Sequence, residues 1–102
     1  MRYYTYILYS PGHDQFYYGQ TQNLGSRLEK HNRGQVRSTK RYMPWLLYAY
    51  LELSSRSESM AMEKKLKNLH GKERLHDFIT SHQFVYKGMP DVGSQEVIGP
   101  EF

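Results

Sequence analysis

Two polar side chains interrupt the apolar stripe of a predicted helix at residues 21–32. Helical spacing places Arg27 and His31 within about 100° of Leu24 and Leu28. A guanidinium offers a permanent charge and a planar fork for a phosphate, and an imidazole can relay a proton. Arg27 and His31 are therefore candidate site residues, with a structural ion pair and a buried core histidine as the alternatives.

A carboxylate occupies a similar place on a second predicted helix. Glu63 lies among the apolar positions of that helix, between Leu66 and Met60. A hard carboxylate oxygen suits Mg²⁺ or Mn²⁺, which keep most of their waters. We therefore predict that Glu63 binds one divalent ion, and the alternative is an ion pair with Lys67 or Lys64.

Two tyrosines share one face if residues 3–20 form a β-hairpin. A tight turn that pairs Tyr9 with Phe16 brings Tyr6 and Tyr17 out on the same side of the sheet. A register shift of one residue would separate them. Because the chain has ten tyrosines, ordinary core packing is the alternative for both.

The positive charge is concentrated in one part of the 102-residue chain, whose formal net charge is +4. Residues 83–102 balance to −2, so residues 1–82 carry +6, and residues 27–41 alone carry +5. Clustered cations attract polyanions, of which nucleic acid is the commonest in a cell. We predict that this stretch grips a nucleic-acid backbone through Arg33, Arg37, Lys40 and Arg41, with a merely solvated surface as the alternative.

These side chains require a small α+β fold to position them. We expect a three-stranded antiparallel sheet, made of the hairpin and a strand at residues 45–51, flanked by about three helices. The helices are predicted at residues 21–32, 55–70 and 72–82, with Gly71 ending the second. Residues 1–82 form the predicted domain, and residues 83–102 form a flexible tail outside it.

Several classes of protein are excluded by composition. The chain has no cysteine, which excludes disulfides, thiolate zinc sites and a cysteine nucleophile. No apolar run approaches the ~18 residues of a membrane-spanning helix, and the N-terminus lacks the features of a secretory signal. We therefore expect a cytoplasmic protein of one domain that does not bind a membrane.

The tyrosine motifs begin an ordered series along the chain. Tyr4-Thr5-Tyr6 and Tyr17-Tyr18-Gly19 precede the helix of Arg27 and His31, and Ser38-Thr39-Lys40, Pro44-Trp45 and the helix of Glu63 follow. This ordered set, which covers residues 3 to about 80, resembles the GIY-YIG nuclease superfamily. The similarity is strongest to its small single-domain bacterial members, which are related to the catalytic domain of the excision-repair incision subunit.

The resemblance implies cleavage of phosphodiester bonds with one Mg²⁺ or Mn²⁺ ion. It makes Tyr6 the general base and Tyr17 a partner that positions water or metal, while His31 orients Tyr6 or relays its proton. Arg27 would stabilise charge on the phosphoryl oxygens, and Glu63 would hold the ion. Because a phenol titrates near ~10, the role of Tyr6 as a base requires a nearby positive charge.

The expected function is that of a structure-selective or weakly specific DNA endonuclease linked to DNA repair or recombination. Its substrate would be branched or nicked DNA, and a partner protein or a homodimer could add to the grip. The chain departs from the signatures at Tyr4, Thr5 and Tyr18, and no asparagine follows Asn68 where many active members have one. The alternatives are a non-cleaving nucleic-acid-binding module of the same fold and a small basic, RNA-associated interaction protein.

Overall fold

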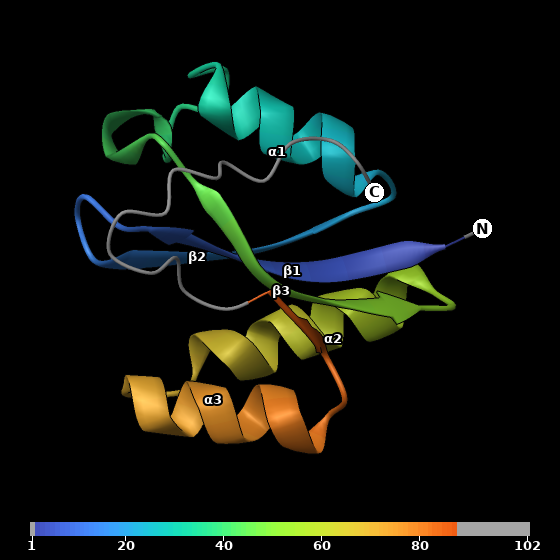
Figure 1. Cartoon of the computed structure of the whole chain (residues 1–102). Coiled ribbons are helices and arrows are strands. Elements are labelled where there is room, and N and C mark those ends of the chain that lie inside the picture. The colour runs from blue at the N-terminus through green and yellow to red at the C-terminus, as the bar shows by residue number, and fades with distance from the viewer. Residues whose placement is uncertain (1, 88–102) are drawn as a thin grey trace.

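The computed structural model describes residues 2–87 and shows an α+β fold (Figure 1). The prediction of an antiparallel sheet with three helices is confirmed, and a short fourth strand extends the sheet to the order β2-β1-β3-β4. In chain order the elements are β1 (Tyr3–Ser10), β2 (Gln15–Thr21), α1 (Leu24–Asn32), the 3₁₀ helix η1 (Lys40–Tyr42), β3 (Leu46–Leu53), α2 (Arg56–Lys67), α3 (Lys72–Ser81) and β4 (Val85–Tyr86).

The N-terminal hairpin has the register that a tight turn predicts. Tyr9 lies opposite Phe16, and Tyr6 lies opposite Gly19. Strand β1 also pairs with β3 on its other side, so β1 lies inside the sheet and β2 forms one edge of it. A side chain of β1 that lies across β2 therefore lies at an edge of the sheet.

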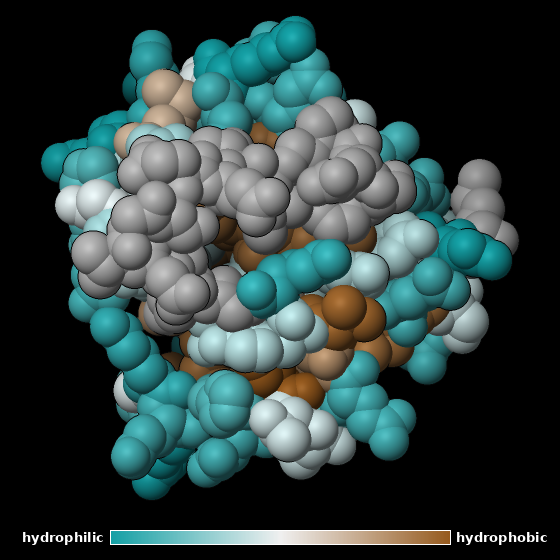
Figure 2. All heavy atoms as spheres, in the orientation of Figure 1, coloured by the Kyte–Doolittle hydropathy of each residue, from teal (hydrophilic) through white to brown (hydrophobic). Residues whose placement is uncertain are grey.

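Helices cover both faces of the sheet, α1 on one and α2 with α3 on the other (Figure 1). The core beneath α1 is centred on Trp45 and Leu28, and the core beneath α2 and α3 is centred on Ile7 and Leu66. Strand β3 contributes to both cores, which explains why its sequence is a nearly continuous apolar run rather than an alternating one. In Figure 2 the outer surfaces over α1 and α3 are mostly hydrophilic.

Helix α2 ends earlier than predicted. It stops at Lys67 with Asn68 as its C-cap, rather than continuing to His70. Gly71 has φ +91° and precedes α3 as its N-cap. The prediction that Gly71 separates the two helices is therefore confirmed, but Gly71 begins the third helix rather than ending the second. Glycine tolerates a positive φ in either place, so its presence alone does not distinguish the two.

The fold continues past residue 82, the predicted end of the domain. Phe84 is buried in the core beneath α2 and α3, and β4 pairs with β3 through Val85 and Tyr86. The remainder of the predicted tail, residues 88–102, lies outside the described residues. Within residues 2–87, none of the helices has the length and hydrophobicity needed to span a bilayer.

Candidate active site

Helix α1 turns two polar side chains toward the sheet. The side chain of Asn23 caps its first turn by accepting a hydrogen bond from the Ser26 N–H at 3.0 Å. Leu24 and Leu28 are buried against the sheet and fix the rotation of the helix, which is short and needs such packing. His31 on the same stripe is fully buried, so the helix holds its ring at the sheet surface.

The hydroxyl of Tyr6 joins these two side chains. Arg27 Nε donates to Tyr6 Oη at 3.2 Å, and Tyr6 Oη lies 3.0 Å from His31 Nε2. The other ring nitrogen, His31 Nδ1, lies 2.7 Å from Thr39 Oγ1. Four residues from β1, α1 and the start of η1 thus form one continuous polar chain through the core beneath α1.

Gly19 provides the space in which the Tyr6 side chain lies. A Cβ atom at position 19 would come within 2.5 Å of Tyr6 Oη and 2.6 Å of Tyr6 Cζ. Since Tyr6 and Gly19 face each other across the β1–β2 pair, the tyrosine ring crosses the edge strand where that strand has no side chain. The glycine of the second tyrosine motif is therefore required for close approach, not for a special backbone angle.

Tyr17 lies beside this polar chain, as the hairpin register predicts. Its ring centroid is 6.3 Å from that of Tyr6 and 4.9 Å from that of His31. Hydrogen bonding to Tyr6, and more weakly interaction with Tyr17, raises the pKa of Arg27. The structure therefore brings together four of the five predicted catalytic side chains on the α1 side of the sheet: Tyr6, Tyr17, Arg27 and His31.

The protonation states of the central pair follow from their surroundings. Burial raises the pKa of Tyr6 to about 12, against the opposing hydrogen bond and charge of Arg27. Burial, and then the charge of Arg27, lowers the pKa of His31 to about 4. At neutral pH the phenol is therefore protonated and the imidazole is uncharged, so Arg27 alone does not produce a phenolate.

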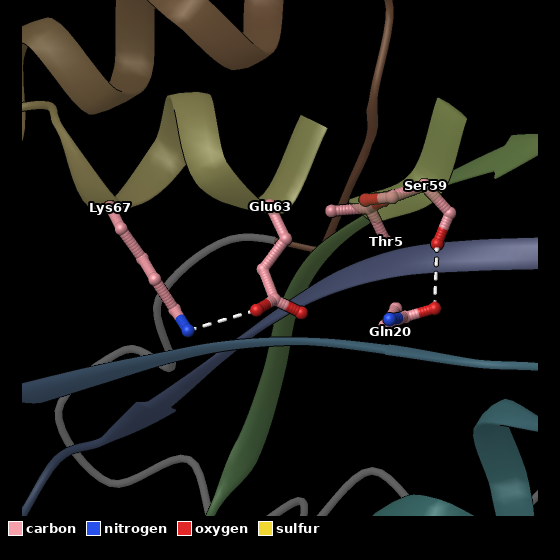
Figure 3. Close-up of polar contacts among 5 residues, drawn as sticks. All are labelled: Thr5, Gln20, Ser59, Glu63 and Lys67. Carbon is pink, nitrogen blue, oxygen red and sulfur yellow. Dashed lines mark hydrogen bonds and ion pairs between the residues drawn. The ribbon is translucent and has the colours of Figure 1, made fainter. Parts of the chain in front are cut away.

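Glu63, the fifth predicted catalytic residue, projects from α2 on the other side of the sheet. Figure 3 shows its side chain pointing from the helix toward the strands, with Lys67 beside it. Lys67 Nζ lies 2.8 Å from Glu63 Oε2, and the Glu63 side chain is 22% exposed. The negative charge of Glu63 is a minor contribution to the raised pKa of Tyr6, and Tyr17 contributes similarly to that of Lys67. The pair on α2 thus interacts electrostatically with both tyrosines.

Two strand residues hold α2 one turn before Glu63. Thr5 Oγ1 donates to the Ser59 carbonyl at 2.9 Å, and Ser59 Oγ donates to Gln20 Oε1 at 3.3 Å (Figure 3). Thr5 and Gln20 are direct partners across the β1–β2 pair. In an α-helix the carbonyl of Ser59 also receives the N–H of Glu63. The backbone of Glu63 is therefore tied to the strand that carries Tyr6.

The predicted nucleic-acid-binding residues lie on the surface after α1. Arg33, Arg37, Lys40 and Arg41 are exposed. Arg33 pairs with Glu29, whereas Arg37, Lys40 and Arg41 form no ion pair within residues 2–87. The Arg41 guanidinium lies over the ring of Tyr42, 5.3 Å from its centroid. Three cations of this group are therefore available to a polyanion.

Sequence reasoning did not single out Thr39, Gly19 or Thr5 as site residues. Thr39 lies in a basic loop without periodicity, so nothing in the spacing indicates that its hydroxyl is buried. Gly19 and Thr5 each occur within a tyrosine motif, and the predicted hairpin register already placed Gly19 opposite Tyr6 and Thr5 opposite Gln20. The register predicts which residues are neighbours, but it does not predict that the ring of Tyr6 lies across Gly19.

Comparison with known proteins shows the family and a similar fold. The family described as the GIY-YIG catalytic domain matches residues 2–76. Among solved structures, the chain is similar to the UPF0213 protein BH0048 from Bacillus halodurans, with 25% identity and a TM-score of 0.50 over 97% of this chain and 99% of that one. No curated protein matches the chain.

Proposed function

The chain belongs to the GIY-YIG catalytic domain family, and on that premise we propose that it is a metal-dependent DNA endonuclease. Membership implies a nuclease-type domain with a nucleic-acid substrate. The finer assignment is that it hydrolyses phosphodiester bonds in branched or nicked DNA, with structure selectivity or weak sequence specificity. A role in DNA repair or recombination follows from that substrate.

The polar chain from Arg27 through Tyr6 to His31 supports this function best. A histidine with only a structural role needs hydrogen-bond partners and nothing more. Here the buried tyrosine–histidine pair also has an arginine, which is permanently charged, at its partly exposed end. Such an arrangement places a cation for a phosphoryl oxygen beside a route for a proton. Both are requirements of phosphodiester hydrolysis.

Each member of the chain has a role in the proposed reaction. Arg27 binds the scissile phosphate and stabilises the charge that develops on it. Tyr6 Oη keeps a free lone pair, with which it orients the attacking water and accepts its proton as its own proton moves to His31. Because the charge of Arg27 helps to lower the pKa of His31, a bound phosphate that neutralises Arg27 makes His31 a better proton acceptor. Tyr17, beside both rings, positions the water.

Glu63 fits the divalent ion that the family implies. It is a single carboxylate, and residues 2–87 contain no cluster of three potential His, Cys, Asp or Glu ligands. One carboxylate with open coordination positions suits Mg²⁺ or Mn²⁺, which retain waters and bind substrate oxygens. When bound, such an ion supplies Lewis-acid stabilisation of charge on the phosphate.

The exposed cations after α1 would hold the flanking DNA backbone. Arg37, Lys40 and Arg41 can pair with backbone phosphates of any sequence, and such contacts position the nucleic acid without specifying it. A domain of this size has a small footprint, so we expect low affinity that falls steeply with salt. A partner protein or a second copy of the chain would add to that grip.

The decisive experiment compares two glutamate variants in a nicking assay. We expect the wild-type chain to nick branched or flapped DNA with Mg²⁺ or Mn²⁺, and Glu63→Ala to lose activity by on the order of 10³-fold. Glu73→Ala is the matched control, because it removes an exposed acid from α3. Circular dichroism and thermal unfolding of both variants check that the fold is intact.

Two results would contradict the proposal. Equal rates for wild type and Glu63→Ala would remove Glu63 from the reaction. Failure of the purified wild type to cut any substrate in a panel of branched, flapped and nicked DNA would instead favour the non-cleaving module. In that case the salt-dependent binding of DNA through Arg37, Lys40 and Arg41 should still be measurable.

A further inference from the structure

Thr39 is a buried hydroxyl at the inner end of the polar chain. It is 1% exposed and lies between α1 and η1. Its Oγ1 lies 2.7 Å from His31 Nδ1 and donates to the Val36 carbonyl at 3.4 Å. Its own carbonyl accepts the indole N–H of Trp45 at 3.0 Å, which fixes the loop against the core.

One assignment of the protons gives every hydrogen bond in the chain a donor and an acceptor. Arg27 can only donate, so Tyr6 Oη accepts from it and is free to give its own proton to His31 Nε2. In this assignment His31 Nε2 is unprotonated, and the proton of the neutral ring lies on Nδ1. That N–H donates to Thr39 Oγ1, whose proton goes to the Val36 carbonyl. One tautomer of His31 satisfies all of these groups.

The other tautomer would break the relay. With the proton on Nε2, both Arg27 and His31 would donate to Tyr6 Oη, and the tyrosine proton would have no acceptor in the histidine ring. At the other end of the ring, Nδ1 would need the proton of Thr39 Oγ1, which would then give up its 3.4 Å bond to the Val36 carbonyl. That carbonyl also accepts the N–H groups of Thr39 and Lys40, at 3.1 and 3.0 Å. The tautomer of His31 therefore depends on whether Nδ1 has a hydroxyl that accepts its proton, and Thr39 Oγ1 is that hydroxyl.

We propose that Thr39 is a positioning residue that holds the proton of His31 on Nδ1, so that Nε2 can accept the proton of Tyr6. This inference rests on the proposed function, and it assigns the relay its direction. The attacking water gives one proton to Tyr6 Oη, Tyr6 gives its proton to Nε2, and the water oxygen forms the new bond to phosphorus. The bond from phosphorus to the leaving oxygen breaks, and that oxygen takes a proton from solvent. His31, now an imidazolium hydrogen-bonded to Tyr6 and Thr39, then returns its extra proton through Tyr6 to water.

The test measures the tautomer of His31 directly in the whole chain. Chemical shifts of ¹⁵N-labelled histidine at pH 7 distinguish a protonated from an unprotonated ring nitrogen. We expect Nδ1–H in the wild type, a shift toward Nε2–H in Thr39→Val, which removes the hydroxyl but keeps the shape, and retention of Nδ1–H in Thr39→Ser. In cleavage of a flapped DNA with Mn²⁺, Thr39→Val should lower kcat by about 10-fold or more with little change in KM, and Thr39→Ser should restore it.

The outcomes separate this inference from the proposed function. A wild-type His31 protonated on Nε2 overturns the inference without any variant, so a poorly folding Thr39→Val does not prevent the test. Retention of Nδ1–H in a folded Thr39→Val also overturns it. If the tautomer changes as expected but the wild type cuts no DNA, Thr39 retains its effect on His31 and the endonuclease proposal fails.

Discussion

Substitution of Gly19 by alanine tests the geometry of the site most directly. The added Cβ would lie 2.5 Å from Tyr6 Oη, whereas ordinary van der Waals contact begins near 3.4 Å. Either the tyrosine hydroxyl or the edge strand must therefore move by about 1 Å. Tyr6 is 2% exposed, so its ring has little free volume into which to withdraw.

The displacement should affect activity more than folding. The bond of 3.0 Å between Tyr6 and His31 and the bond of 3.2 Å that Arg27 donates to Tyr6 cannot both survive a shift of that size. A misplacement of about 1 Å costs an enzyme on the order of 10²-fold in rate. Overpacking of the core should lower the free energy of unfolding by about 1–3 kcal/mol. We therefore expect a folded Gly19→Ala variant that is nearly inactive.

Gly12→Ala is the matched control for this prediction. Gly12 lies in the hairpin turn, where a Cβ would meet nothing within 4 Å, and its φ is not positive. Initial nicking rates on one flapped substrate and thermal unfolding should be measured for both variants and the wild type. A Gly19→Ala variant that cuts within threefold of the Gly12→Ala control would refute the account of Tyr6 lying across the edge strand.

Three further predictions concern neighbouring residues. Burial lowers the pKa of His31 from 6.5 to about 4 in the folded chain, so the unfolded chain takes up a proton first as the pH falls. The free energy of unfolding should therefore drop as the pH falls from about 6.5 to about 4. Denaturant unfolding at pH 7 and pH 5 should show a smaller drop for His31→Gln, and an equal drop would contradict the assignment. Lys67→Met removes the competitor for Glu63 and should raise the apparent Mn²⁺ affinity about twofold, since an ion pair one helical turn apart is worth about 0.3–0.5 kcal/mol and Lys67 is 57% exposed. Weaker Mn²⁺ binding would argue against Glu63 as the ligand. Thr5→Val should speed amide hydrogen exchange at Glu63, whereas Thr5→Ser should not, and identical exchange in both would show that the bond to Ser59 does not hold the helix.

The local patterns of the sequence predicted the parts of the site that share one element or one pair of strands. The hairpin register follows from the length of the turn, so the common face of Tyr6 and Tyr17 could be predicted. Arg27 and His31 were identifiable because they violate the apolar stripe of α1, and both indeed contact Tyr6. Periodicity is informative in these cases because the helix or strand fixes the direction of each side chain.

The parts that could not be predicted depend on contacts between elements. Thr39 lies in a loop, where no period relates sequence position to burial. Strand β4 has only two residues, both exposed, so it carries no hydrophobic signal of its own. The distance between Glu63 and Tyr6 depends on how α2 packs across the sheet, which is fixed by single hydroxyls such as that of Thr5 rather than by a pattern.

The position of β2 at the edge of the sheet limits how copies of this chain can associate. An edge strand with unpaired backbone groups can pair with a strand of another molecule. On β2, that pairing would build a new strand beside Gly19 and Tyr17 and close the approach to Tyr6. On the proposal that the chain cuts DNA, an active homodimer must therefore use another surface, and association through β2 would block cleavage.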